Sequence, residues 1–70
     1  MYKIYTRKLQ AGEYHIELRF EGDLINEITT NDSQLYDDCF IYKNKDYFYE
    51  HELEMFDTYE ELIEYIIELK

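Results

Sequence analysis

EYHIELRFE, at residues 13–21, alternates apolar and polar side chains without interruption. One face would carry Tyr14, Ile16, Leu18 and Phe20, and the other face would carry His15 and the charged residues. A repeat of two residues is typical of a strand with one buried face. This stretch therefore predicts an amphipathic β-strand that forms one wall of the core.

Further strands are expected on both sides of this one. Residues 2–9 are rich in aromatic and β-branched types with polar residues between them, which favours a strand. Gly22-Asp23 suits a two-residue hairpin turn, because glycine adopts positive φ at low cost. Residues 24–30 are then expected to return as a third strand.

The second half of the chain is expected to add two more strands. Residues 31–38 are polar and suit a loop, and strands are predicted at 39–42 and 46–56. The Glu, Leu and Met content of residues 46–56 would also tolerate a helix. In that alternative, residues 46–70 form a helical hairpin or one bent helix.

A helix is predicted at residues 58–69. Thr58 and Glu61 form a capping box, in which side chains satisfy backbone N–H groups at the helix start. Apolar residues follow at the spacing of one buried face, namely Tyr59, Leu62, Ile63, Ile66 and either Ile67 or Leu69. The chain is thus expected to be a single α+β domain, residues 1–70, with an antiparallel sheet of about four to five strands and one C-terminal helix packed on a face.

Charge is the most unusual property of the composition. The 17 Asp and Glu residues exceed the 7 Lys and Arg residues, which leaves a net charge of −10 on 70 residues. Residues 46–69 contain nine acids and no Lys or Arg. A domain of this charge repels nucleic acid and anionic membranes, so direct binding to either is not expected.

The spacing of the acids suggests imitation of a phosphate backbone. Glu60, Glu64 and Glu68 would follow one another at about 6 Å along the predicted helix. Successive phosphates on one DNA strand are separated by a similar distance, since the rise is roughly 3.4 Å per nucleotide plus the helical sweep. Like charges four residues apart cost about 0.2–0.5 kcal/mol per pair, so a face of one sign suggests a cationic partner.

A protein-binding surface is therefore the expected functional site. The candidate residues are Glu50, Glu52, Glu54, Glu60, Glu61, Glu64 and Glu68, with Asp37, Asp38 and Tyr36 at the margin. Tyr36 is included because tyrosine is favoured at protein interfaces. A plain solvated face remains the alternative, since capping and the helix dipole alone favour acids near a helix start.

Catalysis and metal binding are not expected. Cys39 is expected to be a buried structural residue, because no glycine-rich turn is present to supply an oxyanion hole. His15 and His51 are expected at the surface or its rim. The acids within residues 31–38 lack the spacing and glycine of a calcium-binding EF-hand loop. No catalytic residue, metal or cofactor is therefore predicted.

The lone cysteine also bears on location. It excludes an internal disulfide and fits a reducing compartment, so a cytoplasmic protein is expected, in the host cell if the chain is phage-encoded. Neither a signal peptide nor a membrane span is recognisable, because the apolar runs are too short. The expected state is a monomer or a homodimer.

Tyrosine and glutamate residues are interleaved in residues 46–61, DYFYEHELEMFDTYEE. With its small size, acidity and lone cysteine, the chain resembles small phage-encoded DNA-mimic inhibitors, a group that includes anti-restriction proteins, anti-CRISPR proteins and uracil-DNA glycosylase inhibitors. The resemblance is one of composition and includes no family motif. It implies an inhibitor whose carboxylates replace phosphates in a Lys/Arg-lined groove of a nucleic-acid-binding protein or nuclease complex.

Two other functions remain open. A barstar-like immunity protein or antitoxin would block the active site of a basic nuclease through the same electrostatics. A self-assembling structural subunit would instead use attraction between copies of the chain. Lys3, Arg7 and Lys8 of one copy would attract the acidic last third of another copy.

Overall fold

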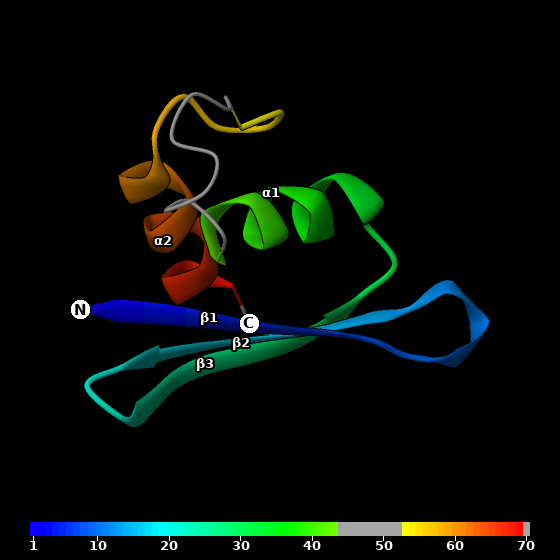
Figure 1. Ribbon diagram of the computed structural model, residues 1–70, viewed down its shortest axis with the longest axis horizontal. Helices are drawn as coiled ribbons and strands as arrows, with labels where there is room; N and C mark the ends of the chain where they lie inside the picture. The colour runs from blue at the N-terminus through cyan, green and yellow to red at the C-terminus, as the bar shows by residue number, and fades with distance from the viewer. Residues whose placement is uncertain (44–52, 70) are drawn as a thin grey trace.

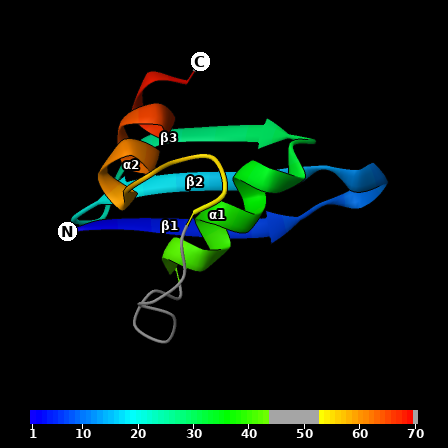
Figure 2. The same ribbon diagram turned by 90° about the horizontal axis from the view of Figure 1, so that it is seen from above.

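The computed structural model describes residues 1–43 and 53–69, which form an antiparallel sheet with helices on one face (Figure 1). The elements are β1 (Tyr2–Lys8), a short 3₁₀ turn η1 (Gln10–Gly12), β2 (Tyr14–Phe20), β3 (Asp23–Thr30), α1 (Ser33–Lys43) and α2 (Tyr59–Glu68). The strands pair in the order β1-β2-β3. Seen from above, α1 crosses β1 and β2, while α2 lies at one end of the sheet near β3 (Figure 2). The predicted α+β class with an antiparallel sheet is confirmed, although the described residues form three strands and two helices.

The central strand β2 follows the predicted alternation. Its inward-facing Ile16 and Leu18 have no exposed surface. Ile16 pairs with Ile28 of β3, and Leu18 pairs with Ile4 of β1, so the apolar faces of all three strands meet on the helix side. The strands predicted at 2–9, 13–21 and 24–30 therefore correspond to β1, β2 and β3.

The turn between β2 and β3 lies one residue earlier than predicted. Its two turn residues are Glu21 (φ 51°) and Gly22 (φ 90°), and Asp23 already pairs with Phe20. Two positive φ values match the two-residue hairpin turn whose twist agrees with that of the flanking strands. The prediction placed glycine first in the turn, whereas the register of β3 requires it second.

The loop predicted at 31–38 is wrong from residue 33 onward, and the strand predicted at 39–42 is wrong, because residues 33–43 form helix α1. The carboxylate of Asp32 starts the helix. Its Oδ1 accepts hydrogen bonds from the backbone N–H groups of Gln34 (3.1 Å) and Leu35 (3.2 Å). These donors lack partners within the helix, and an aspartate in this position is among the best N-terminal caps.

The buried side of α1 is helical in spacing but not uniformly apolar. It consists of Leu35, Asp38, Cys39 and Tyr42. Asp38 interrupts the apolar stripe, and Phe40 is 45% exposed on the opposite side. The sequence therefore shows no clear repeat of 3.6 residues here, which explains the wrong prediction.

The strand predicted at 46–56 lies partly outside the described residues, which exclude 46–52. Residues 53–56 form neither a strand nor a helix. The helix predicted at 58–69 is confirmed as α2, and Thr58 Oγ1 accepts a hydrogen bond of 3.2 Å from the N–H of Glu61. The Glu61 carboxylate in turn accepts from the N–H of Asp57 (3.1 Å). The capping box thus has its second bond one residue before the cap.

One hydrophobic core joins the sheet to both helices. Its buried members besides the inner strand residues Ile4, Ile16 and Leu18 are Leu35, Cys39, Tyr42, Leu62, Ile63 and Ile66. Leu69 packs against this core, whereas Ile67 is 41% exposed. Of the two positions that the sequence left open, Leu69 is therefore the one that packs on the core, where it is partly buried.

The side chain of Asn26 fixes the end of α2 to the sheet. Its Nδ2 donates to the carbonyl oxygens of Ile66 (2.8 Å) and Leu69. The Ile66 carbonyl also accepts a bond of 3.3 Å from the N–H of Leu69, so the amide adds a C-terminal cap supplied by β3 to the last turn of the helix. The outward face of α2 is consequently held in a defined direction.

Candidate protein-binding surface

The outer face of α2 carries a row of three glutamates. Glu60, Glu64 and Glu68 are all exposed and follow one another at steps of about 6 Å. We call these three residues the acidic row. They point outward because Leu62 and Ile66 bury the opposite side of α2 in the core.

The neighbouring acids have separate positions. Glu61 is exposed beside the acidic row, although its carboxylate also takes part in the helix cap. Glu54 and Asp37 are exposed near the joint between α1 and the segment before α2. The predicted contacts at residues 50 and 52 lie outside the described residues.

Asp38 cannot contact a partner as predicted, because its side chain has no exposed surface. Its Oδ1 accepts a hydrogen bond from the N–H of Glu54 (2.8 Å), and its Oδ2 accepts from the N–H of Met55 (2.9 Å). A buried carboxylate is costly unless such donors compensate for the lost water. Asp38 therefore joins α1 to the segment leading into α2.

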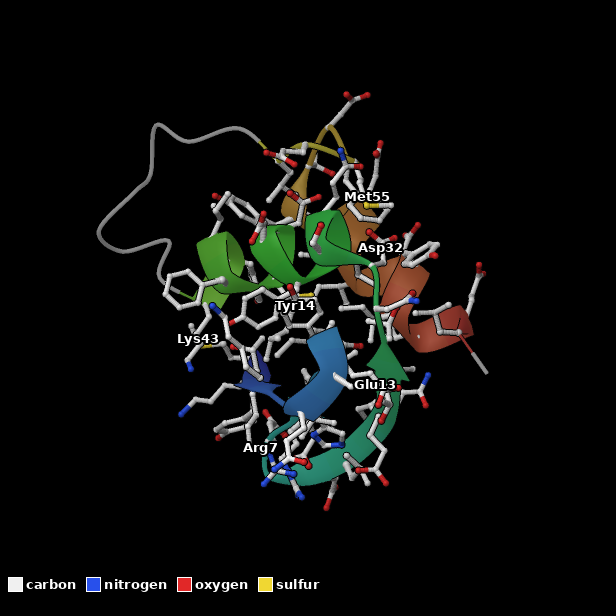
Figure 3. The ribbon with its side chains drawn as sticks, turned by 90° about the vertical axis from the view of Figure 1, so that its right-hand side faces the viewer. Arg7, Glu13, Tyr14, Asp32, Lys43 and Met55 are labelled. Atoms are coloured by element: carbon white, nitrogen blue, oxygen red, sulfur yellow. The ribbon has the colours of Figure 1, made fainter. Side chains whose placement is uncertain are left out.

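Tyr36 lies apart from the acidic row. Its ring stacks on Tyr14 with centroids 4.4 Å apart, and the Nζ of Lys8 lies 5.7 Å from its centroid. Figure 3 views the molecule from the end at which Tyr14 is labelled, and α2 lies at the other end of the sheet (Figure 1). The half-buried Tyr36 thus forms an aromatic stack with Tyr14, and the structure does not bring it together with the acidic row.

A hollow of about 460 Å³ lies beside the acidic row. It is lined by Tyr2, Tyr42, Tyr59, Glu60, Ile63, Glu64 and Ile67. We call it the tyrosine hollow. The sequence prediction missed it, but a signal was present: Tyr59, Ile63 and Ile67 occupy every fourth position of the helix, next to Glu60 and Glu64.

The outer face of the sheet differs in charge from α2. It carries Lys3, Arg7 and Arg19, together with two glutamates that form local pairs. Glu17 pairs with Arg19, and Glu27 lies 3.4 Å from the imidazole of His15. Figure 3 shows Arg7 on this sheet side and Met55 on the helix side. The described residues 53–69 contain no Lys or Arg, so the two sides of the molecule have different electrostatic character.

The predicted burial of Cys39 is confirmed, although the residue lies in α1 and not in a strand. Its side chain has no exposed surface. Burial, with a smaller contribution from the charge of Asp38, raises the pKa of the Cys39 thiol from 9.0 to about 12. The residue is therefore a neutral thiol at pH 7 and lacks the reactive thiolate of a nucleophilic cysteine.

One tyrosine of the hollow is also perturbed. Burial and then the negative charge of Glu60 raise the pKa of the Tyr42 phenol above its ordinary value of 10.0. The hydroxyl of Tyr42 donates to the backbone oxygen of Tyr2 (3.2 Å). Tyr42 is thus a neutral, fixed wall of the hollow.

Within residues 1–43 and 53–69, no group of three or more His, Cys, Asp or Glu side chains is arranged to hold a metal ion. Neither of the helices in this part of the chain has the length and apolarity needed to cross a membrane.

Comparison with protein-family models, with curated proteins and with solved structures finds no match to this chain. The acidic row and the tyrosine hollow are therefore the features from which its function is inferred.

Proposed function

We propose that this chain is a protein inhibitor that binds a cationic, nucleic-acid-binding surface of another protein or nuclease complex. The carboxylates of the acidic row occupy the positions that phosphates take in the normal complex. The supporting observation is that Glu60, Glu64 and Glu68 are all exposed on a helix that is fixed at both ends. The described residues 53–69, which include this helix, contain no Lys or Arg. The step of about 6 Å between the glutamates suits cationic groups spaced to bind consecutive phosphates.

The energetics of the helix support the same proposal. Each like-charge pair four residues apart costs about 0.2–0.5 kcal/mol, and the row contains two such pairs. The substitution Glu64→Lys would convert the repulsions of Glu64 with Glu60 and with Glu68 into attractions. A cationic partner relieves the repulsion and also accelerates association through electrostatic steering.

In the proposed role the chain occupies the nucleic-acid-binding surface of its partner and catalyses no reaction. It works in a reducing compartment such as the cytoplasm, where Cys39 remains a thiol. The partner is a basic nucleic-acid-binding protein or nuclease, and neither nucleic acid nor a membrane is bound directly. A cellular nuclease as the captured partner would indicate the immunity-protein form of the same function.

Capture on the immobilised chain tests the proposal. Extract enriched for nucleic-acid-binding proteins is applied at about 0.1 M salt, where charges interact over about 10 Å, and captured proteins are displaced with duplex DNA. The test variant is Glu60→Gln/Glu64→Gln/Glu68→Gln. The matched control, Glu13→Gln/Glu21→Gln/Asp23→Asn, removes the same formal charge from exposed residues at or beside the ends of the strands.

We expect the wild type and the control to retain a nucleic-acid-binding protein that DNA displaces, and the test variant to lose it. Equal capture by the test variant would refute the role of the acidic row. Equal loss in both variants would show that net charge alone is responsible.

Self-assembly is a second candidate, favoured by the charge difference between the two sides of the molecule. The basic side chains on the outer face of the sheet are complementary to the acidic row of another copy. Association of this kind joins unlike surfaces and would form closed rings or open chains. Light scattering at low and high salt distinguishes it, because such assemblies would dissociate as salt is added.

A further inference from the structure

The tyrosine hollow is built by three elements that meet beside the acidic row. Tyr2 comes from β1, Tyr42 from the last turn of α1, and Tyr59 from the first turn of α2. The rings of Tyr42 and Tyr59 are 5.2 Å apart at 41°, and Tyr42 is held by its bond to the backbone of Tyr2. The aromatic walls are therefore positioned before any ligand arrives.

The remaining lining residues determine which ligand charge is favoured. Glu60 and Glu64 are exposed members of the acidic row, and both also border the hollow. The described lining contains no cationic side chain. Aromatic faces attract cations through their negative quadrupole, and nearby carboxylates add direct attraction. The hollow consequently favours a cation over a neutral or anionic group.

The size and lining of the tyrosine hollow indicate which kind of cation it favours. A volume of about 460 Å³ lies in the lower part of the range for ligand pockets, about 300–1,000 Å³, and suits a single long side chain. Ile63 and Ile67 offer an apolar wall for a methylene stem. A planar guanidinium stacks on aromatic rings and bonds carboxylates in a fork, whereas an ammonium ion is compact and strongly hydrated.

We infer that the tyrosine hollow binds one arginine side chain of the partner protein. The guanidinium lies against the tyrosine rings and pairs with Glu60 and Glu64, while the stem packs on Ile63 and Ile67. This inference rests on the proposed function, because the partner supplies the arginine. It adds a specific anchor to a surface that otherwise recognises charge, and arginine is among the residues that most often dominate protein interfaces.

A nuclear magnetic resonance titration tests the hollow without the partner. The nitrogen-15-labelled full chain is titrated with N-acetyl-arginine methylamide, with the lysine analogue, and with the citrulline analogue, which has the same shape but no charge. We expect saturable shifts at the hollow residues with the arginine compound, weaker binding of the lysine compound, and no saturation with citrulline. Saturation by citrulline at the same concentration would overturn the inference.

Two double variants with equal charge locate the interaction. Glu60→Gln/Glu64→Gln removes both carboxylates of the hollow, and should weaken binding of the arginine compound about three- to tenfold. Glu13→Gln/Glu21→Gln removes two exposed carboxylates that lie outside the acidic row and do not line the hollow, and should retain that binding. Equal weakening in both variants would show general attraction to an acidic surface and would refute a site.

The two proposals can fail separately. Loss of partner capture in the acidic-row variant, with no binding of the arginine compound to the wild type, would refute only the hollow. Arginine binding in the hollow, with no captured partner that DNA displaces, would refute only the inhibitor function.

Discussion

The buried carboxylate of Asp38 accepts a 2.9 Å hydrogen bond from the backbone amide of Met55, which joins the middle of α1 to the segment before α2. The neighbouring amide of Glu54 donates to the other carboxylate oxygen. Asp38 has no exposed surface, so these bonds replace water that the carboxylate has lost. The position of the acidic row therefore depends partly on Asp38, a buried carboxylate that lies outside the row and is not exposed to a binding protein.

Replacing Asp38 should destabilise the fold strongly. Asp38→Ala leaves two backbone donors without their acceptor, and we expect the free energy of unfolding to fall by about 2–4 kcal/mol. Urea titration followed by circular dichroism measures this loss. Asp37→Ala is the matched control, since Asp37 is exposed, and its effect should stay within about 0.5 kcal/mol. Similar losses in both variants would contradict the role of the buried carboxylate.

The Cys39 thiol should be protected from alkylation in the folded protein. Raising the pKa from 9.0 to about 12 lowers the thiolate fraction at pH 8 by about a thousandfold. Reaction with iodoacetamide, followed by mass spectrometry, should be slow in native buffer and reach the rate of an ordinary thiol in urea. Rapid modification without denaturant would contradict the observed burial.

Stability should fall in alkaline solution for the same reason. The pKa of Cys39 is higher in the folded state, so its contribution is fully present below pH 9 and is lost as pH rises toward about 12. The raised pKa of Tyr42 acts in the same direction. Urea midpoints between pH 8 and pH 11 measure the decline, and Cys39→Ala should reduce its slope. An unchanged slope in that variant would assign the decline to tyrosines.

Asn26 should contribute through its contact with the end of α2. Asn26→Ala removes the side-chain amide that donates to the carbonyls of Ile66 and Leu69, and we expect a loss of about 1–2 kcal/mol. Thermal unfolding provides the measurement. Thr29→Ala, on the outer face of the same strand, is the control and should change stability by less than about 0.5 kcal/mol. If the two substitutions were equivalent, the cap would have no energetic role.

Relieving the acidic row should increase stability while it weakens binding. Glu64→Gln removes two like-charge pairs and should stabilise the fold by about 0.4–1 kcal/mol at low salt. The gain should disappear near about 1 M salt, where the Debye length is about 3 Å. Thermal unfolding at both ionic strengths tests this, alongside capture of the partner. Loss of stability at low salt would show that Glu64 is structurally favourable.

Elements with regular patterns could be predicted from the sequence. The uninterrupted alternation in β2 and the capping box of α2 each combine a local signal with the period of a buried face. The exposure of the acidic row followed from the apolar positions of the same helix. These predictions succeeded because local preference and tertiary burial agreed.

Helix α1 and the tyrosine hollow could not be predicted by the same route. Asp38 occupies a core position only because the amides of Glu54 and Met55 reach it, and that contact depends on the tertiary fold. Because Asp38 interrupts the apolar spacing of α1, the sequence pattern predicted a loop and a strand where the chain forms a helix. The hollow likewise requires side chains from β1, α1 and α2, whose meeting depends on the arrangement of the helices over the sheet.

The separation of charge between the sheet and α2 also affects how the molecule moves before it touches anything. With bases on the outer face of the sheet and the acidic row on the helix side, the protein has a permanent electric dipole moment. A strongly cationic surface exerts a torque on such a dipole as well as a pull on the net charge. Rotational diffusion is thereby biased, and the molecule reaches that surface with α2 already leading.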